Sequence, residues 1–600
     1  MRSLCRCNDS FRHRFVAGPA ARQAILALAL GISAIGPRAA IAQAGRSPVP
    51  AKHGMVASSH YLASEVGVDI LKRGGNAIDA AVATAFAAAV VFPAAGNVGG
   101  GGFIVYHGAD GEVTAFNFRE KAPIAAGERM FATDDDEIAT SDFAWKGAWG
   151  GVDDEANHEG LLSVGVPGTV AGLYLAHQRL GRLPWSELVQ PAIDLARDGF
   201  PLSWAELRIQ ETIARNAEKY RSTADAFLKE GDAPHEPGEI WKQPDLAVTL
   251  ERIRDDGRDG FYKGETARLI ADFMRKHGGL ITEEDLARYQ ATEQPPIHGT
   301  YRGYDIYAMS PPSSGGVALV EMLNILEGQQ ISGMGHNSAQ YLHTITEAMR
   351  VAFRDRATFI GDPDFNPDMP IQRLTSKSYA DSIRATISPA IAGVSDSSLA
   401  ISWYESEETT HFSVVDSAGN AVSFTTTLEY GYGSRIVVEG AGFLLNNEMG
   451  DFNPIPGLTD TRGYIGTPPN LVAPEKRMLS SMTPTIVASK GKPVLVVGTP
   501  GGRTIINSVL QVILNVIDFR MNVALAVEAP RIHHQWLPDE VRHESFGFSL
   551  DTMEKLRLMG HDVVQHGEQG QVNAIYIDHQ DGMLYGAADS RAFDSRAVGF

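Results

Sequence analysis

The sequence predicts an α+β protein, and three stretches carry this prediction. Residues 58–118 show a helical apolar period followed by two β-rich runs around a Gly-containing turn. Residues 165–290 show the spacing of amphipathic helices separated by Gly and Pro. Residues 410–428 form two β-rich runs on either side of a polar turn at 416–420. Helices and hairpins therefore occupy different stretches of one chain.

Individual elements are expected at defined positions within and beyond these stretches. Gly74-Gly75-Asn76 separates the first two helices. The most apolar run, 80–95, is short and contains Pro93, so we expect a buried helix there rather than a membrane span. The other expected elements are strands at 103–106, 113–118, 410–415, 421–428, 493–497 and 575–577, helices at 168–180, 185–198 and 504–516, and a tight turn at 498–502.

The first 44 residues have the layout of a secretory signal peptide. Five arginines precede the apolar run 24–35, and Ala40, Ala42 and Ala44 offer Ala-x-Ala cleavage options. The apolar run is too short to span a bilayer comfortably. A disordered basic leader is the alternative. We therefore expect export, with cleavage at Ala42 or Ala44, into a bacterial periplasm first and into the medium second.

Cysteine usage and charge exclude several function classes. Both cysteines, Cys5 and Cys7, lie in the leader, so the mature chain would hold no disulfide, no Cys nucleophile and no Cys-ligated metal. Without the leader the chain carries 46 basic and 71 acidic residues, a net charge of −25 with His neutral. Nucleic acid and anionic membrane surfaces are poor partners for such a chain.

Familiar cofactor and hydrolase motifs are missing from the sequence. His533 and His534 are adjacent and cannot face one ion as an i, i+4 pair would. No G-x-S-x-G elbow occurs, and the glycine-rich run 96–102 is not followed by Gly-Lys-Ser/Thr. We expect no cofactor and no catalytic metal, which leaves Ser, Thr, Lys or carboxylates as chemical agents.

Thr409 stands where a threonine could become a nucleophile. A free α-amine on the same residue, with a pKa of about 7.7 to 8.0, can act as the base that the hydroxyl needs. This requires cleavage directly before the threonine, and the polar, acidic segment 388–408 leads straight into the strand that starts there. If the hairpin is centred between Ala418 and Gly419, Thr427 pairs with Thr410 and lies beside Thr409. Taken alone, a loop that leads into a Thr-rich strand is the plainer interpretation.

A family resemblance supports the chemical interpretation. Residues 409–416 together with 419–422 closely resemble the start of the small subunit of γ-glutamyltranspeptidases, members of the N-terminal-nucleophile hydrolases. Further stretches match in the same order, and the similarity covers nearly all of residues 54–600; these stretches are 74–81, 118–123, 479–484 and 498–502. The resemblance implies a four-layer αββα sandwich.

The resemblance also implies self-cleavage between Glu408 and Thr409. The expected parts are a signal peptide, residues 1–44, a large subunit, 45–408, and a small catalytic subunit, 409–600, which build one intertwined unit. Thr409 would be the nucleophile and its own amine the general base, with Thr427 supporting the hydroxyl. Gly501 and Gly502 would form the oxyanion hole, since backbone N–H groups between a strand and a helix can converge on an anion.

The remaining matched residues would bind the amino-acid end of the substrate. Arg119 matches the arginine that pairs with the α-carboxylate, a task suited to a planar bidentate donor. Asp451 matches the carboxylate that binds the α-ammonium. Glu429 and Glu448 match flanking polar positions, and Ser480 and Ser481 would donate to the α-carboxylate.

Each of these residues also has a purely structural interpretation. Arg119 with Glu120 could be a surface ion pair, the acids could be solvated, and the Ser and Gly pairs could be plain turns. Two departures from the family pattern concern the ligand region: Glu429 stands where some relatives have Asn, and Met478 replaces the Pro usual before Leu-Ser-Ser. Arg462 and Tyr464 are candidates for a gating side chain in a lid loop.

The resemblance implies transfer of the γ-glutamyl group of glutathione or a similar compound onto Thr409, and then to water, an amino acid or a peptide. One alternative is a cephalosporin or glutaryl acylase of the same superfamily, whose substrate lacks the α-ammonium. A non-catalytic protein that retains the fold is the second. Neither the preferred donor and acceptor nor the association of heterodimers follows from the sequence.

Overall fold

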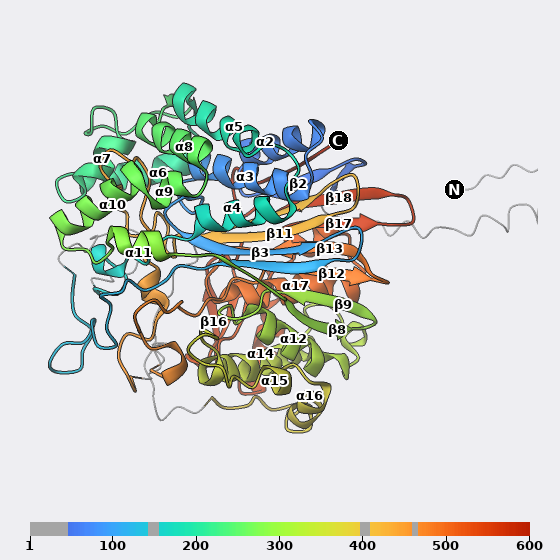
Figure 1. Cartoon of the computed structure of the whole chain (residues 1–600). Helices are drawn as coiled ribbons and strands as arrows, with labels where there is room; N and C mark the ends of the chain where they lie inside the picture. The colour runs from blue at the N-terminus through green and yellow to red at the C-terminus, as the bar shows by residue number, and fades with distance from the viewer. Residues whose placement is uncertain (1–45, 142–154, 396–408, 459–465) are drawn as a thin grey trace, which may run out of the picture. The chain divides into compact units, whose positions relative to one another are not determined.

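Two seven-stranded sheets lie face to face in the computed structural model, and helices cover both outer faces (Figure 1). The structure describes residues 46–141, 155–395, 409–458 and 466–600. All strand pairs within both sheets are antiparallel. The predicted four-layer αββα sandwich is therefore confirmed.

Sheet I and sheet II are named here by their strands. In spatial order, sheet I consists of β1 (Val49–Ala51), β18 (Met583–Ala588), β17 (Asn573–Asp578), β13 (Lys492–Gly498), β12 (Thr485–Ser489), β9 (Tyr304–Ala308) and β8 (Ile297–Tyr301). Sheet II consists of β19 (Arg596–Gly599), β2 (Met55–Ser58), β10 (Thr410–Val415), β11 (Ala421–Thr427), β3 (Gly101–His107), β4 (Val113–Phe118) and β7 (Thr292–Gln294). Smaller pairings join β14 (Ile532–His533), β15 (Val541–Glu544) and β16 (Val563–His566), and β5 (Phe200–Pro201) with β6 (Ile240–Trp241).

The helices fall into two sequence groups, one for each outer layer. The sheet II group is α2 (Tyr61–Lys72), α3 (Ala77–Val91), α4 (Thr169–Leu180), α5 (Trp185–Asp198), α6 (Trp204–Arg215), α7 (Arg221–Phe227), α8 (Pro244–Asp256), α9 (Asp259–Tyr262), α10 (Gly264–His277) and α11 (Glu283–Arg288). The sheet I group is α12 (Gly315–Glu327), α13 (Ile331–Met334), α14 (Ala339–Phe359), α15 (Ile371–Leu374), α16 (Lys377–Arg384), α17 (Thr504–Ile517), α18 (Val523–Glu528) and α19 (Leu550–Leu558). Three short 3-10 turns are η1 (Leu161–Ser163), η2 (Glu448–Asp451) and η3 (Pro468–Asn470).

Side chains that alternate between the two faces of each strand divide the core into layers. On β10, Phe412 and Val414 belong to the core between sheet II and its helices, whereas Val415 belongs to the core between the sheets. Phe412 stacks on Phe424 of β11 with ring centroids 4.2 Å apart. Since successive side chains on a strand point to opposite faces, Thr409, His411 and Ser413 face sheet I. The predicted nucleophile therefore starts a strand whose polar side chains lie between the sheets.

Helix α3 lies wholly inside the molecule, as predicted for the apolar run 80–95. All of its residues are buried, and its many alanines let it pack closely against α2, α4 and α5. Asn76 and Asp79 form a capping box at its start, and the helix ends at Val91, just before Pro93. The carboxylate of Asp416 accepts from the Ala77 amide at 3.0 Å, which fixes the β10–β11 turn to this helix.

The register of the β10–β11 hairpin differs from the prediction by one residue. Thr410 pairs with Thr426, not with Thr427. The Asp416 amide donates to the Asn420 carbonyl at 3.1 Å, and Gly419, at φ +93°, takes the left-handed position of a three-residue loop centred on Ala418. When the register is continued by one pair, Thr427 lies directly opposite Thr409. The two hydroxyls are 3.3 Å apart, so the sequence correctly places a second hydroxyl near Thr409.

Strands from both sides of the predicted cleavage point alternate within the two sheets. In sheet II, β10 and β11 lie between β2 and β3, which come from the first half of the chain. In sheet I, β12 pairs with β9 and β18 pairs with β1. Residues 46–600 accordingly form one compact unit, while the cut itself remains a prediction.

Most of the other expected elements are present. The structure confirms the β3–β4 hairpin, helices α4 and α5, strand β13, helix α17 and strand β17. Of the polar segment 388–408, residues 396–408 lie outside the described residues. Residues 388–394 are exposed or half-buried, and Ser395 is buried. None of the described helices combines the length and apolar character needed to cross a membrane.

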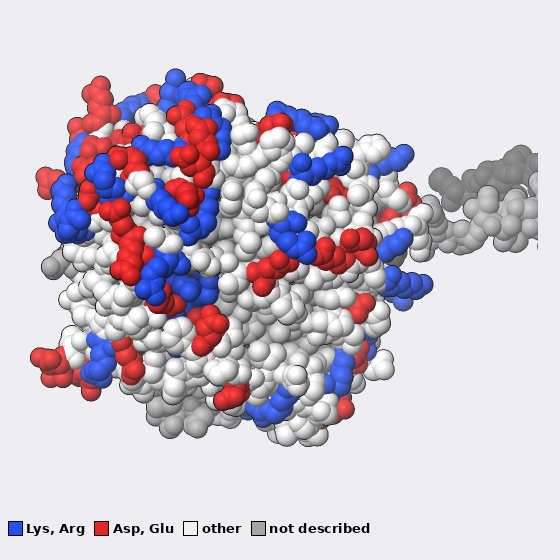
Figure 2. All heavy atoms as spheres, viewed as in Figure 1, with Lys and Arg blue, Asp and Glu red and all other residues white. Residues whose placement is uncertain are grey.

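The charged side chains on one face show no single-sign patch. On the face in Figure 2, acidic and basic groups are interspersed over the helices around α8 and α10. Pairs such as Arg197 with Glu251 and Arg268 with Asp272 lie in this region. Since solvent screens such pairs, they contribute little stability, and their effect is mainly to balance the local charge.

Replacement of Gly172 by Ala tests the packing of α4 on sheet II. A Cβ at Gly172 would lie 2.1 to 2.5 Å from atoms of Phe118, the residue before Arg119. Ala normally stabilises a helix by about 1 kcal/mol relative to Gly, but here overpacking should lower the free energy of unfolding by about 1 to 3 kcal/mol. Urea unfolding of the purified native protein and variants measures this free energy.

Gly333→Ala in α13 is the matched control, since the nearest atom to its added Cβ is 3.9 Å away. It should leave the free energy of unfolding unchanged or slightly raised. Equal effects of the two substitutions would contradict the close approach of α4 to Phe118.

Candidate active site

A cavity at one end of the sheets gathers most of the residues singled out in the sequence. Its lining consists of Arg119, Thr409, Thr427, Glu429, Glu448, Asp451, Ser480, Ser481, Met482, Gly502 and Ile505. Of the predicted site residues, Gly501 precedes a lining residue, and Glu408, Arg462 and Tyr464 lie outside the described residues. Met482 and Ile505 are apolar additions that sequence reasoning missed. The cavity brings the predicted residues together, while the roles of the individual side chains stay predictions.

Thr409 and Thr427 form the polar pair at the cavity end of sheet II. The Thr409 hydroxyl donates to the Thr427 hydroxyl at 3.3 Å, and both residues are buried. The Glu429 amide also donates to the Thr427 hydroxyl at 2.8 Å. Because Thr427 receives this fixed N–H, its oxygen is held in one place opposite Thr409.

His411 lies where β10, the strand that follows Thr409, packs on sheet I. Its ring contacts the hydroxyls of Thr425 at 2.9 Å and Ser413 at 3.1 Å, and Ser413 donates to the Asn573 carbonyl at 3.0 Å. A Cβ at Gly498 would lie 2.4 Å from the ring, so glycine is needed there. Burial lowers the pKa of His411 to about 3. With this lowered pKa, the ring accepts a proton only weakly and is a poor candidate for the base.

Arg119 is fully buried at the end of β4 and forms the charged centre of the cavity. Its guanidinium pairs with Glu448, with Asp451 and, at 3.5 Å, with Glu120. Its Nε donates to the Met478 carbonyl at 3.3 Å. Both Arg119 and Glu120 have no exposed side-chain surface, so the alternative of a surface ion pair is wrong.

Burial and neighbouring charge shift the protonation of this cluster. Burial alone would lower the pKa of Arg119, but Glu448, Asp451 and Glu120 outweigh it and raise the pKa, so the guanidinium stays charged. Burial raises the pKa of Glu448 well above its usual value, although Arg119 opposes this. Burial likewise raises the pKa of Glu120 to about 7 against the effect of Arg119. Burial therefore favours the protonated forms of Glu120 and Glu448 near neutral pH.

Two buried asparagines position the carboxylates of η2. The Asn446 side chain accepts from the amides of Gly165 at 2.8 Å and Glu448 at 3.1 Å. The Asn447 side chain accepts from the Tyr430 amide at 3.0 Å and donates to the His158 carbonyl at 3.1 Å. The solvated interpretation of Glu448 is wrong, since these contacts hold it in the interior.

Glu429 adopts a left-handed backbone, at φ +81°, two residues after the end of β11. Its Oε1 lies 3.2 Å from Nδ1 of His158, whose ring stacks on Tyr430. A Cβ at Gly450 would lie 2.3 Å from that nitrogen and 3.0 Å from the Glu429 oxygen. Gly450 therefore lets η2 approach Glu429, which is nearly buried rather than solvated.

Ser480 and Ser481 lie beside Arg119 because the preceding backbone wraps around the guanidinium. The Met478 and Leu479 carbonyls accept from Arg119 at 3.3 and 3.1 Å. Met478, the expected departure from the family pattern before Leu-Ser-Ser, is fully buried. These contacts keep Ser480 and Ser481 at the cavity without the stiffness that proline would supply.

Gly501 and Gly502 form the turn between β13 and α17. Their φ angles are +132° and +52°, values that side chains rarely adopt, and a Cβ at Gly501 would lie 2.5 Å from Thr504 Oγ1. Thr504 donates its amide to the Gly501 carbonyl at 2.9 Å, which starts the helix. Gly502 lines the cavity and Gly501 does not. The turn leaves backbone N–H groups near the start of a helix, which is the layout that anion binding requires.

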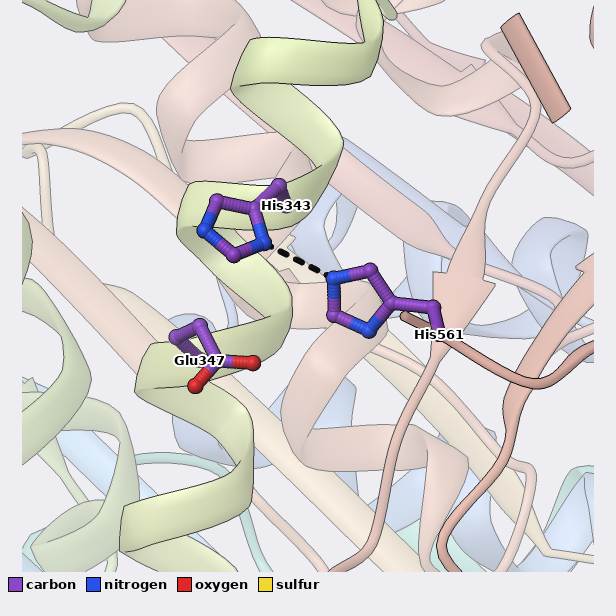
Figure 3. A group of neighbouring side chains, drawn as sticks. All are labelled: His343, Glu347 and His561. Carbon is purple, nitrogen blue, oxygen red and sulfur yellow. Dashed lines mark hydrogen bonds between the residues drawn. The ribbon is translucent and has the colours of Figure 1, made fainter. Parts of the chain in front are cut away.

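A group of buried side chains away from the cavity could share a metal ion: His343 and Glu347 on α14, and His561 (Figure 3). His343 Nε2 lies 2.7 Å from the Ser388 carbonyl, so this nitrogen carries the proton. Its Nδ1 lies 2.8 Å from His561 Nε2. Burial, together with His343 and Arg350, lowers the pKa of His561 to about 3. His343 therefore has both ring nitrogens in hydrogen bonds, and His561 has its Nε2 in one.

The adjacent histidines His533 and His534 each have their own partner. His533 Nδ1 lies 2.7 Å from Asn507 Nδ2, and His534 Nε2 lies 3.0 Å from Asp539. The His343 group was missed in the sequence because His561 is far along the chain from the i, i+4 pair His343 and Glu347. It links α14 to residues 388–395, since Gly393 donates to Glu347 at 3.1 Å.

Comparison with known proteins identifies the family. The family model described as gamma-glutamyltranspeptidase matches residues 63–599. The glutathione hydrolase proenzyme of Escherichia coli is 46% identical over 556 residues, which cover 92% of this chain and 93% of that protein.

The chain belongs to the γ-glutamyltranspeptidase family. It is also similar to the acylase ACY 1 proenzyme of a Pseudomonas species, at 37% identity over 93% of this chain and 95% of that protein. The γ-glutamyltranspeptidase family consists of enzymes acting on γ-glutamyl amide bonds, so the predicted enzyme class is confirmed.

Two solved structures agree with this γ-glutamyltranspeptidase assignment. The γ-glutamyltranspeptidase of Helicobacter pylori superposes with a TM-score of 0.54 at 43% identity, over 57% of this chain and 94% of that one. A cephalosporin acylase from Bacillus halodurans superposes with a TM-score of 0.79 at 28% identity, over 94% of this chain and 99% of that one. The same sandwich therefore occurs in proteins named for different substrates.

Glu120→Gln tests the charge competition at Arg119. As the pH rises through about 7, Glu120 ionises. If Arg119 binds the α-carboxylate of a γ-glutamyl donor, as predicted, the Glu120 carboxylate would compete with it for the guanidinium. The KM for the donor should rise by roughly three- to tenfold above that pH in the native protein. In Glu120→Gln the KM should stay flat over the same range, measured as a pH profile with a chromogenic γ-glutamyl anilide.

Asp581→Asn is the control, because Asp581 lies on an exposed turn and accepts from Tyr585. It should keep the native profile. An unchanged pH dependence of KM in Glu120→Gln would contradict the competition.

Proposed function

We propose that this chain is an exported, self-cleaving γ-glutamyltransferase that uses Thr409 as nucleophile and acts on glutathione and related γ-glutamyl compounds. One observation carries the proposal: the Thr409–Thr427 hydroxyl pair shares a cavity with the Arg119–Asp451 ion pair. The first pair suits acyl transfer, and the second suits an amino-acid zwitterion. A glutathione hydrolase name for the Escherichia coli relative supports this donor.

The zwitterionic end of the donor would replace an internal ion pair. Arg119 would leave Asp451 to take the α-carboxylate, and Asp451 would take the α-ammonium. Each buried charge would then exchange its partner for a donor group with the same charge as that partner, so none is left unpaired. Ser480 and Ser481 would donate to the α-carboxylate, and Glu429 and Glu448 flank the ammonium side.

Self-cleavage would prepare the nucleophile. The Thr409 hydroxyl attacks the Glu408 carbonyl, the peptide C–N bond breaks, and the nitrogen takes a proton as the Thr409 amine. Water then hydrolyses the ester, leaving a Glu408 carboxylate and a free Thr409 hydroxyl. The word proenzyme in the names of relatives supports a processed precursor. Large and small subunits would stay together because their strands alternate in both sheets.

Catalysis would follow a two-step transfer. The Thr409 amine takes the proton of its own hydroxyl, the oxygen attacks the γ-carbonyl, and the leaving amine receives the proton. Gly501 and Gly502 N–H groups would hold the oxyanion, and each such donor is worth about 2.7 to 4 kcal/mol in comparable enzymes. Water, an amino acid or a peptide then accepts the γ-glutamyl group, which predicts ping-pong kinetics.

A glutaryl or cephalosporin acylase is the second candidate, because acylases occur among the relatives. An acylase would share the self-cleaving chemistry and would differ only in the acyl group that the cavity binds. Asp451 favours the γ-glutamyl donor, since a glutaryl chain has no ammonium to occupy it. The Thr409–Thr427 pair in the same cavity as the buried Arg119 cluster favours an enzyme over a non-catalytic protein with this fold.

Export rests on the leader alone. The basic start, the apolar run 24–35 and the Ala-x-Ala options support a cleaved signal peptide and a periplasmic enzyme. Amino-terminal sequencing of both fragments from a periplasmic extract tests the leader and the internal cut together. A single intact amino terminus at Met1 would contradict export.

Thr409→Ala should abolish both self-cleavage and activity. The variant should migrate as one uncut chain, and the release of aniline from a γ-glutamyl anilide should fall at least roughly 1,000-fold. Mass spectrometry of the native protein should find a fragment that begins at Thr409.

Thr410→Ala is the matched control, because this neighbouring hydroxyl faces the other side of the strand and contacts Ser59 at 3.2 Å. It should be cut and active. An active native protein with an unbroken peptide bond between residues 408 and 409 would refute the mechanism.

Asp451→Asn should separate the two acyl substrates. Loss of a charge that pairs with the α-ammonium should lower kcat/KM for the γ-glutamyl anilide by roughly 100-fold or more. The kcat/KM for the matched glutaryl anilide should stay the same. If the native protein prefers the glutaryl anilide and the variant retains that activity, the acylase assignment replaces the one proposed.

A further inference from the structure

Arg356 reaches the cavity from behind Ser481. It lies in the last turn of α14 and is nearly buried, on the helix face that also carries Met349, Ala352 and Phe353. Its Nη2 donates to the Ser481 hydroxyl at 2.9 Å, and its Nε donates to the Ser314 hydroxyl at 2.9 Å. A buried arginine thus holds two serines with the two ends of one rigid guanidinium.

These contacts determine which way the Ser481 hydroxyl hydrogen can point. A guanidinium has donors only, so the Ser481 oxygen accepts from Arg356. The hydrogen of Ser481 is then available to another acceptor. Since Ser481 lines the cavity together with Arg119, an anion in the cavity can receive it. Contact with a cation also makes this hydroxyl a stronger donor.

Ser480 is placed through Ser314. Because the Ser314 oxygen accepts from Arg356, its own hydrogen goes to the Ser480 carbonyl at 2.7 Å, and the Ser314 amide donates to the same carbonyl at 2.8 Å. The Ser480 hydroxyl accepts from the Met482 amide at 3.2 Å. The hydrogen of Ser480 is therefore also available to an acceptor in the cavity.

We propose that Arg356 is a positioning residue for the α-carboxylate of the donor, which it serves by orienting the hydroxyls of Ser480 and Ser481 toward the cavity. This inference rests on the proposed γ-glutamyl function. It adds to Arg119, which would contact the carboxylate directly, a second cation that acts only through serine hydroxyls. Its effect should therefore depend on the presence of an α-carboxylate in the substrate.

The test compares two donors that differ only in that carboxylate. Native protein, Arg356→Met and Arg356→Lys are assayed with γ-glutamyl anilide and with 4-aminobutyryl anilide, which lacks the α-carboxylate. For Arg356→Met, the KM for the γ-glutamyl anilide should rise roughly 10- to 100-fold with a much smaller change in kcat. The kcat/KM for the 4-aminobutyryl anilide should stay within about twofold of the native value. Arg356→Lys keeps the charge but has no planar fork, so its KM for the γ-glutamyl anilide should lie between the values of the native protein and Arg356→Met.

Arg354→Met is the matched control on the same helix. Arg354 is half-exposed and pairs with Asp355 at 2.8 Å, on a different side of α14 from the cavity. It should leave both donors unaffected. Self-cleavage should be complete in all three variants, because that reaction involves no α-carboxylate.

Equal losses with both donors would overturn the inference, since a merely structural role for Arg356 would impair both. If Arg356→Met does not yield folded protein, Arg356→Lys carries the same test, and an equal loss in Arg356→Lys has the same meaning. Absence of aniline release by the native protein would refute the proposed function instead. The two failures are therefore distinguishable.

Discussion

The pairing of β10 with β11 is the constraint on which the site depends. Its register sets Thr427 opposite Thr409, and its alternation turns both hydroxyls toward sheet I while Phe412 and Phe424 anchor the other face in the helical layer. A shift by one residue would move every side chain of β10 to the opposite face and bury the hydroxyl among apolar groups. The turn fixes this register through Gly419 and the Asp416 contact with α3.

A second constraint is the cost of burying charge. Arg119 has no exposed surface, and such a group is tolerated only where carboxylates and backbone carbonyls surround it. The protein meets this cost with Glu448, Asp451 and Glu120, whose own burial favours the protonated form of Glu120 and Glu448. The cavity is thus organised before any ligand arrives, and a ligand of the right charge pattern can take over contacts that already exist.

The sequence predicts the local elements well, because helices and hairpins here follow apolar periodicity and Gly or Pro punctuation. It also gives the members of the cavity, but only through family motifs: Arg119, Glu448 and Asp451 carry no local sign that they will be buried together. The hairpin register was wrong by one residue because a turn centre between two residues and one centred on Ala418 differ only in where the left-handed glycine falls. Arg356 was missed, although a charge on the apolar face of α14 was a visible signal. Its partners Ser314 and Ser481 are separated from it along the chain, so no local pattern could name them.

The alternation of strands from both halves of the chain bears on how the molecule could be taken apart. If the chain is cut before Thr409, the central pair β10–β11 of sheet II belongs to one polypeptide and its neighbours β2 and β3 to the other. Separation would then break hydrogen bonds along both edges of the inserted hairpin at once. Reassembly from isolated pieces would have to rebuild the middle of a sheet rather than dock two finished surfaces. Folding is therefore far simpler before the cut than after it, and the processed form would owe its persistence to a slow rate of unfolding rather than to easy recovery.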